Sequence, residues 1–371
     1  MLPGRALFLS LSLFGVRNTL CVKIRARGID AESRAVRAAG ESVKAHSGAS
    51  GAGRLPGARG PPLVCAPMCV RRAKVAENAA RRGSAMLVST QSMLTRAARG
   101  GYAVGQFNIN NLEWIRAAMS AARDMEAPVI LGVTESACAY MGGLRAVRAL
   151  VEGMAGARDD LPMALHLDHA GEDMCLQAIG AGFSSVMFDG SKLPFAENLR
   201  VCAKLAAICR DRGVSLEAEL GSPAGEEDGI SGSGDKALPS QCAELARSGI
   251  SSLAAAIGNI HGEYPAGWPG LDLALLREIR AAVKGLPLVL HGGSGIPDAM
   301  VRESIGLGIC KINVNTECQL AFAEATKEYF ASGRDLEPGG RTLQKVLAPG
   351  TEAVARTIRE KIRFFGSAHT L

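Results

Sequence analysis

Aromatic residues, long apolar runs and cysteines at metal-binding spacing are all scarce in this chain of 371 residues. Only 4% of the residues are aromatic, which counts against a surface that stacks nucleic-acid bases, although the chain is basic overall. The apolar run at residues 6–16 has 11 residues, whereas a helix that spans a bilayer needs about 20. The ten cysteines lack the spacing of a zinc finger or a thioredoxin-like motif, so we expect reduced, mostly buried thiols. These absences predict a cytoplasmic protein that binds neither nucleic acid nor membrane.

Acidic residues are scarce only in the front segment. Residues 1–85 hold 15 Lys and Arg against 4 Asp and Glu, a net charge of +11, whereas residues 86–371 hold 27 against 32, a net charge of −5. The front segment is rich in Arg, Ala, Gly and Ser, as transit peptides and disordered tails are. We therefore predict a basic, low-complexity extension at 1–85, which is disordered, targeting-like or not translated, and a catalytic body at 86–371.

Short β-type runs alternate with helical patterns from Met86 onward. The eight strand candidates are residues 103–110, 128–136, 163–169, 184–189, 214–221, 251–261, 287–291 and 309–315. Apolar residues recur at helical spacing at 112–125, 175–179, 196–208, 271–283 and 300–305, and two closing helices are expected at 320–330 and 354–362. Strict β–α alternation predicts parallel strands joined by crossover helices. Eight such units predict an α/β fold of the (β/α)₈ or TIM-barrel type rather than an open sheet.

Three of the six histidines come at the ends of different predicted strands. His169, His261 and His291 would then meet at the barrel mouth, where three neutral imidazoles form a zinc site with one coordination position open. Each histidine alone is better explained as a core or loop residue, but three at matching depth favour a metal. His166 and His169 point to opposite faces of a regular strand, so we assign His169 as the ligand and His166 to structure.

Carboxylates accompany these histidines. Asp168, Asp189, Glu217 and Glu219 all come near predicted strand ends, and the two glutamates of EAEL share one strand face. A salt bridge or a second shell around the metal would explain such groups. Asp168 adjoins a proposed ligand and could exchange a proton with a substrate hydroxyl.

A glycine-rich turn follows the seventh strand. The sequence GGSGIP (292–297) leads into a helix, so that backbone N–H groups and the helix dipole would face an anion. The polar run NVNT (313–316) ends the eighth strand. Because loops after strands 7 and 8 often form the phosphate site of such barrels, we predict one here.

These motifs together resemble the class II aldolase family, which includes fructose-1,6-bisphosphate and tagatose-1,6-bisphosphate aldolases. The resemblance covers residues 86–371 and depends on FNINN (107–111), HLDH (166–169), DGSKLPFAEN (189–198), EAELG (217–221), GEEDG (225–229), AIGNIHG (256–262), HGGSG (291–295) and KINVNTE (311–317). It implies reversible cleavage of a ketose 1,6-bisphosphate, most simply fructose 1,6-bisphosphate, to dihydroxyacetone phosphate and glyceraldehyde 3-phosphate through a zinc-stabilised enediolate.

The resemblance also implies roles for individual residues. Zn²⁺ would lie on the three histidines, with Asp189 and Glu219 at an outer metal position. Asp168 would give a proton to the C4 oxygen, and Glu227 would exchange the C1 proton of dihydroxyacetone phosphate. The substrate pocket would consist of Thr134, Gly262, Gly292, Gly293, Ser294, Asn313, Val314, Asn315 and Thr316.

Three departures from the family pattern leave the substrate open. The loop at 222–240 is short and rich in Gly and Ser, Lys192 stands where a histidine is common, and no lysine follows Tyr264. The alternatives are a zinc barrel enzyme for another phosphorylated ketose, a zinc hydrolase, and a non-catalytic assembly subunit of a tagatose-bisphosphate aldolase complex. None of the zinc histidines is missing, which counts against the assembly subunit. We further expect a homodimer or homotetramer and a monovalent cation as a second cofactor.

Overall fold

The computed structural model describes residues 14–15, 20–21, 87–155, 161–227 and 229–371. The chain divides into two compact units, Met1–Val64 and Cys65–Leu371. In the first unit, strand β1 (Phe14–Gly15) pairs antiparallel with β2 (Leu20–Cys21). Nearly all of the predicted extension lies outside the described residues, so the boundary at residue 86 stays a proposal. A protein that begins at Met86 would test it and should turn over at the rate of the full chain.

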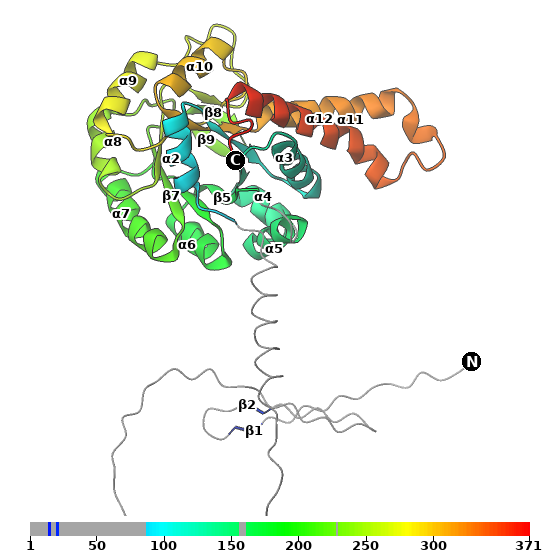
Figure 1. Ribbon diagram of the computed structural model, residues 1–371, viewed down its shortest axis with the longest axis horizontal. Helices are drawn as coiled ribbons and strands as arrows, with labels where there is room; N and C mark the ends of the chain where they lie inside the picture. Colours follow the sequence, from blue (N-terminus) through cyan, green and yellow to red (C-terminus); the bar gives the residue numbers. More distant parts are fainter. Residues whose placement is uncertain (1–13, 16–19, 22–86, 156–160, 228) are drawn as a thin grey trace, which may run out of the picture. The chain divides into compact units, whose positions relative to one another are not determined.

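Eight parallel strands close into a barrel in the second unit (Figure 1). The strands are β3 (Val104–Asn108), β4 (Val129–Val133), β5 (Met163–Ala170), β6 (Ser185–Phe188), β7 (Ser215–Leu220), β10 (Ser252–Ala255), β12 (Leu288–Leu290) and β13 (Ile309–Val314). Each pairs in parallel with its two neighbours, and β13 pairs with β3 to close the ring. The predicted TIM barrel is confirmed.

Helices surround this barrel (Figure 1). Those that sequence periodicity predicts are α3 (Leu112–Asp124), α6 (Glu172–Ala181), α7 (Phe195–Arg212), α9 (Leu273–Ala282), α10 (Asp298–Gly306), α11 (Thr316–Ala331) and α12 (Leu343–Phe364). Those that it did not predict are α2 (Thr90–Gly100), α4 (Glu135–Tyr140), α5 (Leu144–Ala155), α8 (Pro239–Ala246) and the short η1 (Arg334–Leu336). Among the described residues, no helix is both long and apolar enough to cross a membrane.

Side chains alternate between the inside and the outside of the barrel. On β7, Leu216, Ala218 and Leu220 point outward and join the apolar core under the helices. The residues between them, Glu217 and Glu219, point inward and contact histidine side chains on other strands. Because a strand has a two-residue period, one segment can supply both the apolar core and a charged interior. At β7 the barrel therefore has charged side chains inside and apolar side chains outside.

Helix α2 closes the amino end of the barrel. Its side chains Met93, Leu94 and Ala97 share a buried apolar cluster with residues of four strands, namely Val104, Ile130, Ala164 and Cys310. This packing fills one end of the barrel with apolar groups. The carboxyl ends of the strands, where barrel enzymes place their chemistry, are thus left to form the site.

The prediction of one long strand over residues 251–261 is wrong. β10 ends at Ala255, and β11 (Ile260–His261) belongs to a separate sheet with β8 (Ala224–Glu227) and β9 (Ile230–Gly232). The chain turns between the two strands, because Gly258 has a φ of +91° and the Asn259 side chain accepts a hydrogen bond from the N–H of Ile257 at 3.0 Å. His261 is therefore held by an added sheet rather than by a barrel strand.

Candidate metal centre

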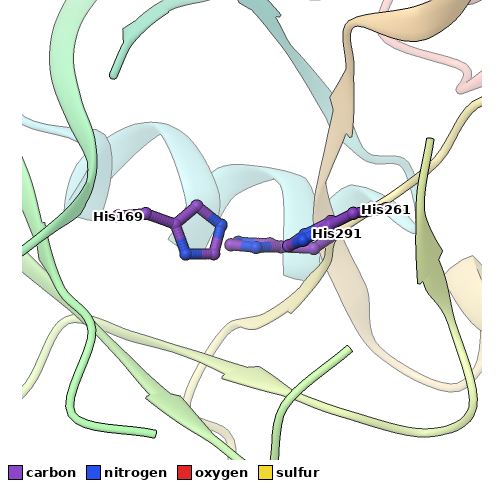
Figure 2. A group of neighbouring side chains, drawn as sticks. All are labelled: His169, His261 and His291. Atoms are coloured by element: carbon purple, nitrogen blue, oxygen red, sulfur yellow. The ribbon is translucent and has the colours of Figure 1, made fainter. Parts of the chain in front are cut away.

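Three histidine side chains meet near the carboxyl ends of the strands (Figure 2). His169 comes from β5, His261 from β11, and His291 directly follows β12. The ring centroids lie 5.1 Å apart for His169 and His261, 4.6 Å for His169 and His291, and 5.8 Å for His261 and His291. One ring nitrogen from each lies within 4.8 Å of the others. The structure thus brings together the three histidines that the sequence selects.

His169 reaches this position through an irregular backbone. Its φ is +45°, and the register between β5 and β6 shifts between Leu167 and Ala170. The side chain therefore leaves the regular alternation of the strand. His166 stays within the barrel, fully buried, with Nδ1 2.7 Å from the hydroxyl of Ser185. The structure places His169, and not His166, with the other two histidines. The strand there is not the regular one that the sequence prediction assumed.

Two carboxylates surround His169. Its Nδ1 lies 3.0 Å from Asp189 Oδ2 and 3.3 Å from Glu219 Oε2. Burial alone would lower the pKa of His169, but these carboxylates raise it well above its ordinary value. Burial raises the pKa of Glu219, which is 1% exposed. His169, Asp189 and Glu219 form a second group whose donor atoms could hold a cation.

Several buried polar atoms of this cluster lack a hydrogen-bond partner among the described residues. They are Nδ1 of His261, Nδ1 of His291 and Oε1 of Glu219. Burial lowers the pKa of His261 to about 3, with the neighbouring histidines adding to the effect, so its imidazole is neutral. Buried polar atoms without a partner are costly, and a neutral imidazole is a good zinc ligand. The donor set therefore fits a Zn²⁺ ion.

Asp168 lies inside the barrel beside the histidines, with 3% of its surface exposed. Its Oδ1 accepts a hydrogen bond from Asn313 Nδ2 at 3.4 Å. Burial alone would raise the pKa of Asp168, but His169 and Lys311 hold it at about 2. The group is thus an ionised carboxylate, ready to accept a proton or a hydrogen bond from a hydroxyl.

Two residues that sequence reasoning missed tie the segments of His261 and His291 together. Asn259 Nδ2 donates to the carbonyl of His291 at 3.1 Å. The Tyr264 hydroxyl accepts from the N–H of Ile260 at 3.0 Å and donates to the carbonyl of Gly292 at 2.8 Å. Both residues lie within five positions of His261 in the sequence, but only the fold reveals that their partners are the carbonyls of His291 and Gly292. They fix the relative placement of two histidines.

The glycine-rich turn meets the end of β13 and the start of α11. The N–H of Gly293 donates to the carbonyl of Asn313 at 2.8 Å. The Ser294 hydroxyl accepts from the N–H of Glu317, in the first turn of α11, at 3.2 Å. The turn and the helix start are therefore in contact, as a shared anion site requires. The N–H groups of Gly293, Gly295 and Glu317 already donate within the protein, so an anion would have to bind other donors of this region.

Gly292 allows the closest approach in this region. Its φ is +63°, and a Cβ atom there would lie 1.9 Å from the carbonyl oxygen of Ile260. Gly213 is a matched position, since its φ is +66° and a Cβ atom there would meet nothing within 4 Å. Alanine at either position would adopt a left-handed backbone conformation, which costs about 1–2 kcal/mol.

We expect Gly292→Ala to cost a further ~1–3 kcal/mol through overpacking, and to weaken metal binding because the clash displaces the neighbour of His261. Thermal unfolding and metal content of the two variants would measure this difference. If Gly292→Ala and Gly213→Ala lost the same amount of thermal stability and of bound metal, the close packing of Gly292 on β11 would be unimportant.

Comparison with known proteins gives the family of this chain. Residues 88–370 match the family profile described as "Fructose-bisphosphate aldolase class-II". The chain belongs to the class II fructose-bisphosphate aldolase family. Members of this family are aldolases, that is, carbon–carbon lyases, and the prediction of such an enzyme is confirmed.

Individual relatives cover the same part of the chain. The fructose-bisphosphate aldolase of Streptococcus pyogenes serotype M3 is 45% identical over 289 residues, which are 76% of this chain and 99% of the relative. That of Mycoplasma genitalium is 46% identical over 285 residues, with the same coverage of 76% and 99%. Among solved structures, the YdjI aldolase of Escherichia coli K12 superimposes with a TM-score of 0.66 at 31% identity, over 76% of this chain and 98% of that one.

The remaining predicted site residues of this aldolase lie around the same mouth. Gly262 follows His261 with a φ of +86°. Thr134 directly follows β4 and is 2% exposed. It caps α4, because its hydroxyl accepts a hydrogen bond from the N–H of Ala137 at 3.2 Å, and this role alone explains a threonine there. The predicted run over 313–316 spans the last residues of β13 and the first of α11. The backbone of Glu227 ends β8, and its side chain is outside the described part of the structure.

Proposed function

We propose that this chain cleaves fructose 1,6-bisphosphate reversibly to dihydroxyacetone phosphate and glyceraldehyde 3-phosphate, with Zn²⁺ on His169, His261 and His291. One observation carries the proposal, namely the buried cluster of three imidazoles in which two ring nitrogens have no hydrogen-bond partner among the described residues. Membership of the aldolase family supports the reaction type. Asp189 and Glu219 are the proposed outer metal position, because both contact His169.

The proposed chemistry divides between the metal and this chain's own acids and bases. Bound zinc would polarise the ketone carbonyl and stabilise the negative charge that develops when the C3–C4 bond breaks. Asp168 holds or returns the proton of the C4 hydroxyl, and its buried place next to His169 in the chain supports this role. Glu227 moves the C1 proton of dihydroxyacetone phosphate. Its place on β8 supports this role, since Gly225 of the same strand pairs with His261.

The anionic ends of the substrate need a separate site. The turn over Gly292, Gly293 and Ser294 and the run over 313–316 are the proposed phosphate pocket, with Gly262 beside them. The contact between Ser294 and the first turn of α11 supports this, because backbone N–H groups and the positive end of a helix dipole favour phosphate. The homo-oligomer and the monovalent cation expected from the resemblance stay proposals, which molar mass in solution and potassium dependence of turnover would test.

The substrate itself is tested by comparing two epimers. Fructose 1,6-bisphosphate and tagatose 1,6-bisphosphate differ only in the direction of the C4 hydroxyl, the group that Asp168 is proposed to serve. We expect kcat/KM for the fructose epimer to exceed that for the tagatose epimer by about tenfold or more, which corresponds to about 1.4 kcal/mol in the transition state. Preference for the tagatose epimer would reassign the substrate within the same reaction. Cleavage of neither would favour a non-catalytic assembly subunit.

A further inference from the structure

A buried ion pair crosses the interior of the barrel beneath the histidine cluster. Lys311 on β13 is 0% exposed and Glu217 on β7 is 1% exposed. The ammonium of Lys311 lies 2.7 Å from Oε1 and 2.8 Å from Oε2 of Glu217, so it donates to both carboxylate oxygens. β13 and β7 are not neighbours in the barrel, since β12 and β10 separate them. The two side chains therefore meet across the barrel lining.

Such a pair needs an explanation beyond stability. Removing two charges from water costs several kcal/mol each, and apolar residues of similar volume often give equal or greater stability. The lining elsewhere shows that this barrel can be filled by apolar groups, because Met187, Ala254 and Val289 form a buried cluster inside it. We therefore expect this buried charged pair to orient or polarise a neighbouring side chain.

The neighbouring group is His291. Its Nε2 lies 3.1 Å from Glu217 Oε1, and the Ser252 hydroxyl donates to Oε2 of the same carboxylate at 3.2 Å. A carboxylate that binds an ammonium with both oxygens can only accept hydrogen bonds, so Nε2 of His291 must carry the hydrogen. In a neutral imidazole the other nitrogen, Nδ1, is then the one with a free lone pair. Nδ1 of His291 is also a buried atom without a hydrogen-bond partner among the described residues, and the nearest carboxylate oxygen, Oε1 of Glu219, lies 3.8 Å away.

We propose that Lys311, acting through Glu217, is a positioning residue that sets the tautomer and ring orientation of His291 and so presents Nδ1 to the metal. This inference rests on the proposed zinc function. It extends that function to a lysine on β13, a strand that carries none of the three proposed ligands. It also assigns the ligand atom of His291 as Nδ1.

The competing explanation is a structural one, in which the pair only fills the barrel and balances charge. The two explanations differ for a variant that removes both charges at once, Glu217→Leu with Lys311→Met. No charge is left unpaired in this variant, so stability should be retained or improved. If the pair is only structural, metal binding should then be unchanged. If the pair positions His291, metal affinity should fall although the fold is intact.

The experiment uses the full chain, freed of metal and titrated with Co²⁺, whose absorption spectrum reports ligand geometry. We expect the double variant to bind Co²⁺ about 10–100-fold more weakly than the unchanged chain, with an altered spectrum. We also expect ¹⁵N spectra of the metal-free protein to show Nε2–H in His291 of the unchanged chain and a mixture of tautomers in the variant. Lys204→Met is the matched control, because Lys204 is 52% exposed and its pair with Glu172 lies on the surface.

Each outcome decides between the possibilities. Equal Co²⁺ affinity and the same His291 tautomer in the double variant and the unchanged chain would overturn this inference alone. Absence of Co²⁺ binding by the unchanged chain would overturn the proposed zinc function and this inference with it. If the double variant does not fold, Glu217→Gln alone tests the same point, since its amide offers one acceptor oxygen and one NH₂ donor in place of two acceptor oxygens. Unchanged affinity there would again overturn the inference.

Discussion

His261→Ala should lose bound zinc and aldol activity while its barrel stays folded. His261 lies on β11, outside the ring of barrel strands, so truncating it leaves the apolar core in place. Loss of a Lewis acid worth several kcal/mol should lower kcat/KM by about 10³-fold or more. Metal analysis, a cleavage assay and thermal unfolding of the same preparation would measure all three quantities.

His369→Ala is the control for this variant. His369 is a surface histidine whose side chain is 65% exposed, and its ion pair with Glu126 is equally exposed. It should keep zinc and activity. Full activity in His261→Ala would remove His261 from the proposed metal site, whatever the metal content of the unchanged chain.

Replacement of Asp168 and Glu227 should separate two proton transfers. Asp168→Asn should stop cleavage yet still let dihydroxyacetone phosphate exchange its C1 proton with solvent, because Asp168 is proposed to serve only the C4 oxygen. Glu227→Gln should lose the exchange as well, by about 10²-fold or more for a positioned base. Cleavage rates and proton exchange followed by NMR would measure the two steps separately.

Glu226→Gln provides the comparison for Glu227, since Glu226 is the exposed neighbour on the same strand. It should retain most of the exchange rate. If Asp168→Asn and Glu227→Gln reduced exchange to the same extent, the division of labour between the two carboxylates would be refuted.

The barrel could be predicted because its signals are local and repeated. Each strand carries its own two-residue alternation, and each of the larger helices carries its own apolar stripe, so counting the units gives the architecture. The prediction of one strand over 251–261 was wrong for the same reason, because the apolar pattern continues past the turn at Gly258 and Asn259. Local hydrophobicity does not show where a strand leaves one sheet and joins another.

Only those residues of the site that come at the ends of predicted strands could be predicted from the sequence. His169, His261 and His291 follow from their places in the chain, and the structure brings them together. The contacts that hold them come from closure of the barrel. Lys311 and Glu217 are 94 residues apart in sequence, and the partners of Tyr264 include a carbonyl 28 residues away. No periodicity records such pairs, so sequence reasoning found the proposed ligands and the carboxylates near them, but not Lys311 or the contacts of Asn259 and Tyr264.

The central claim is that cleavage of fructose 1,6-bisphosphate by this chain depends on one metal ion held by three histidines. The most direct measurement is the cleavage rate of the full chain as purified, after dialysis against a chelator, and after Zn²⁺ is returned. We predict about one zinc per chain, a fall in activity of about 10³-fold or more when the metal is removed, and recovery of activity when zinc is restored. Full activity in metal-free protein would contradict it.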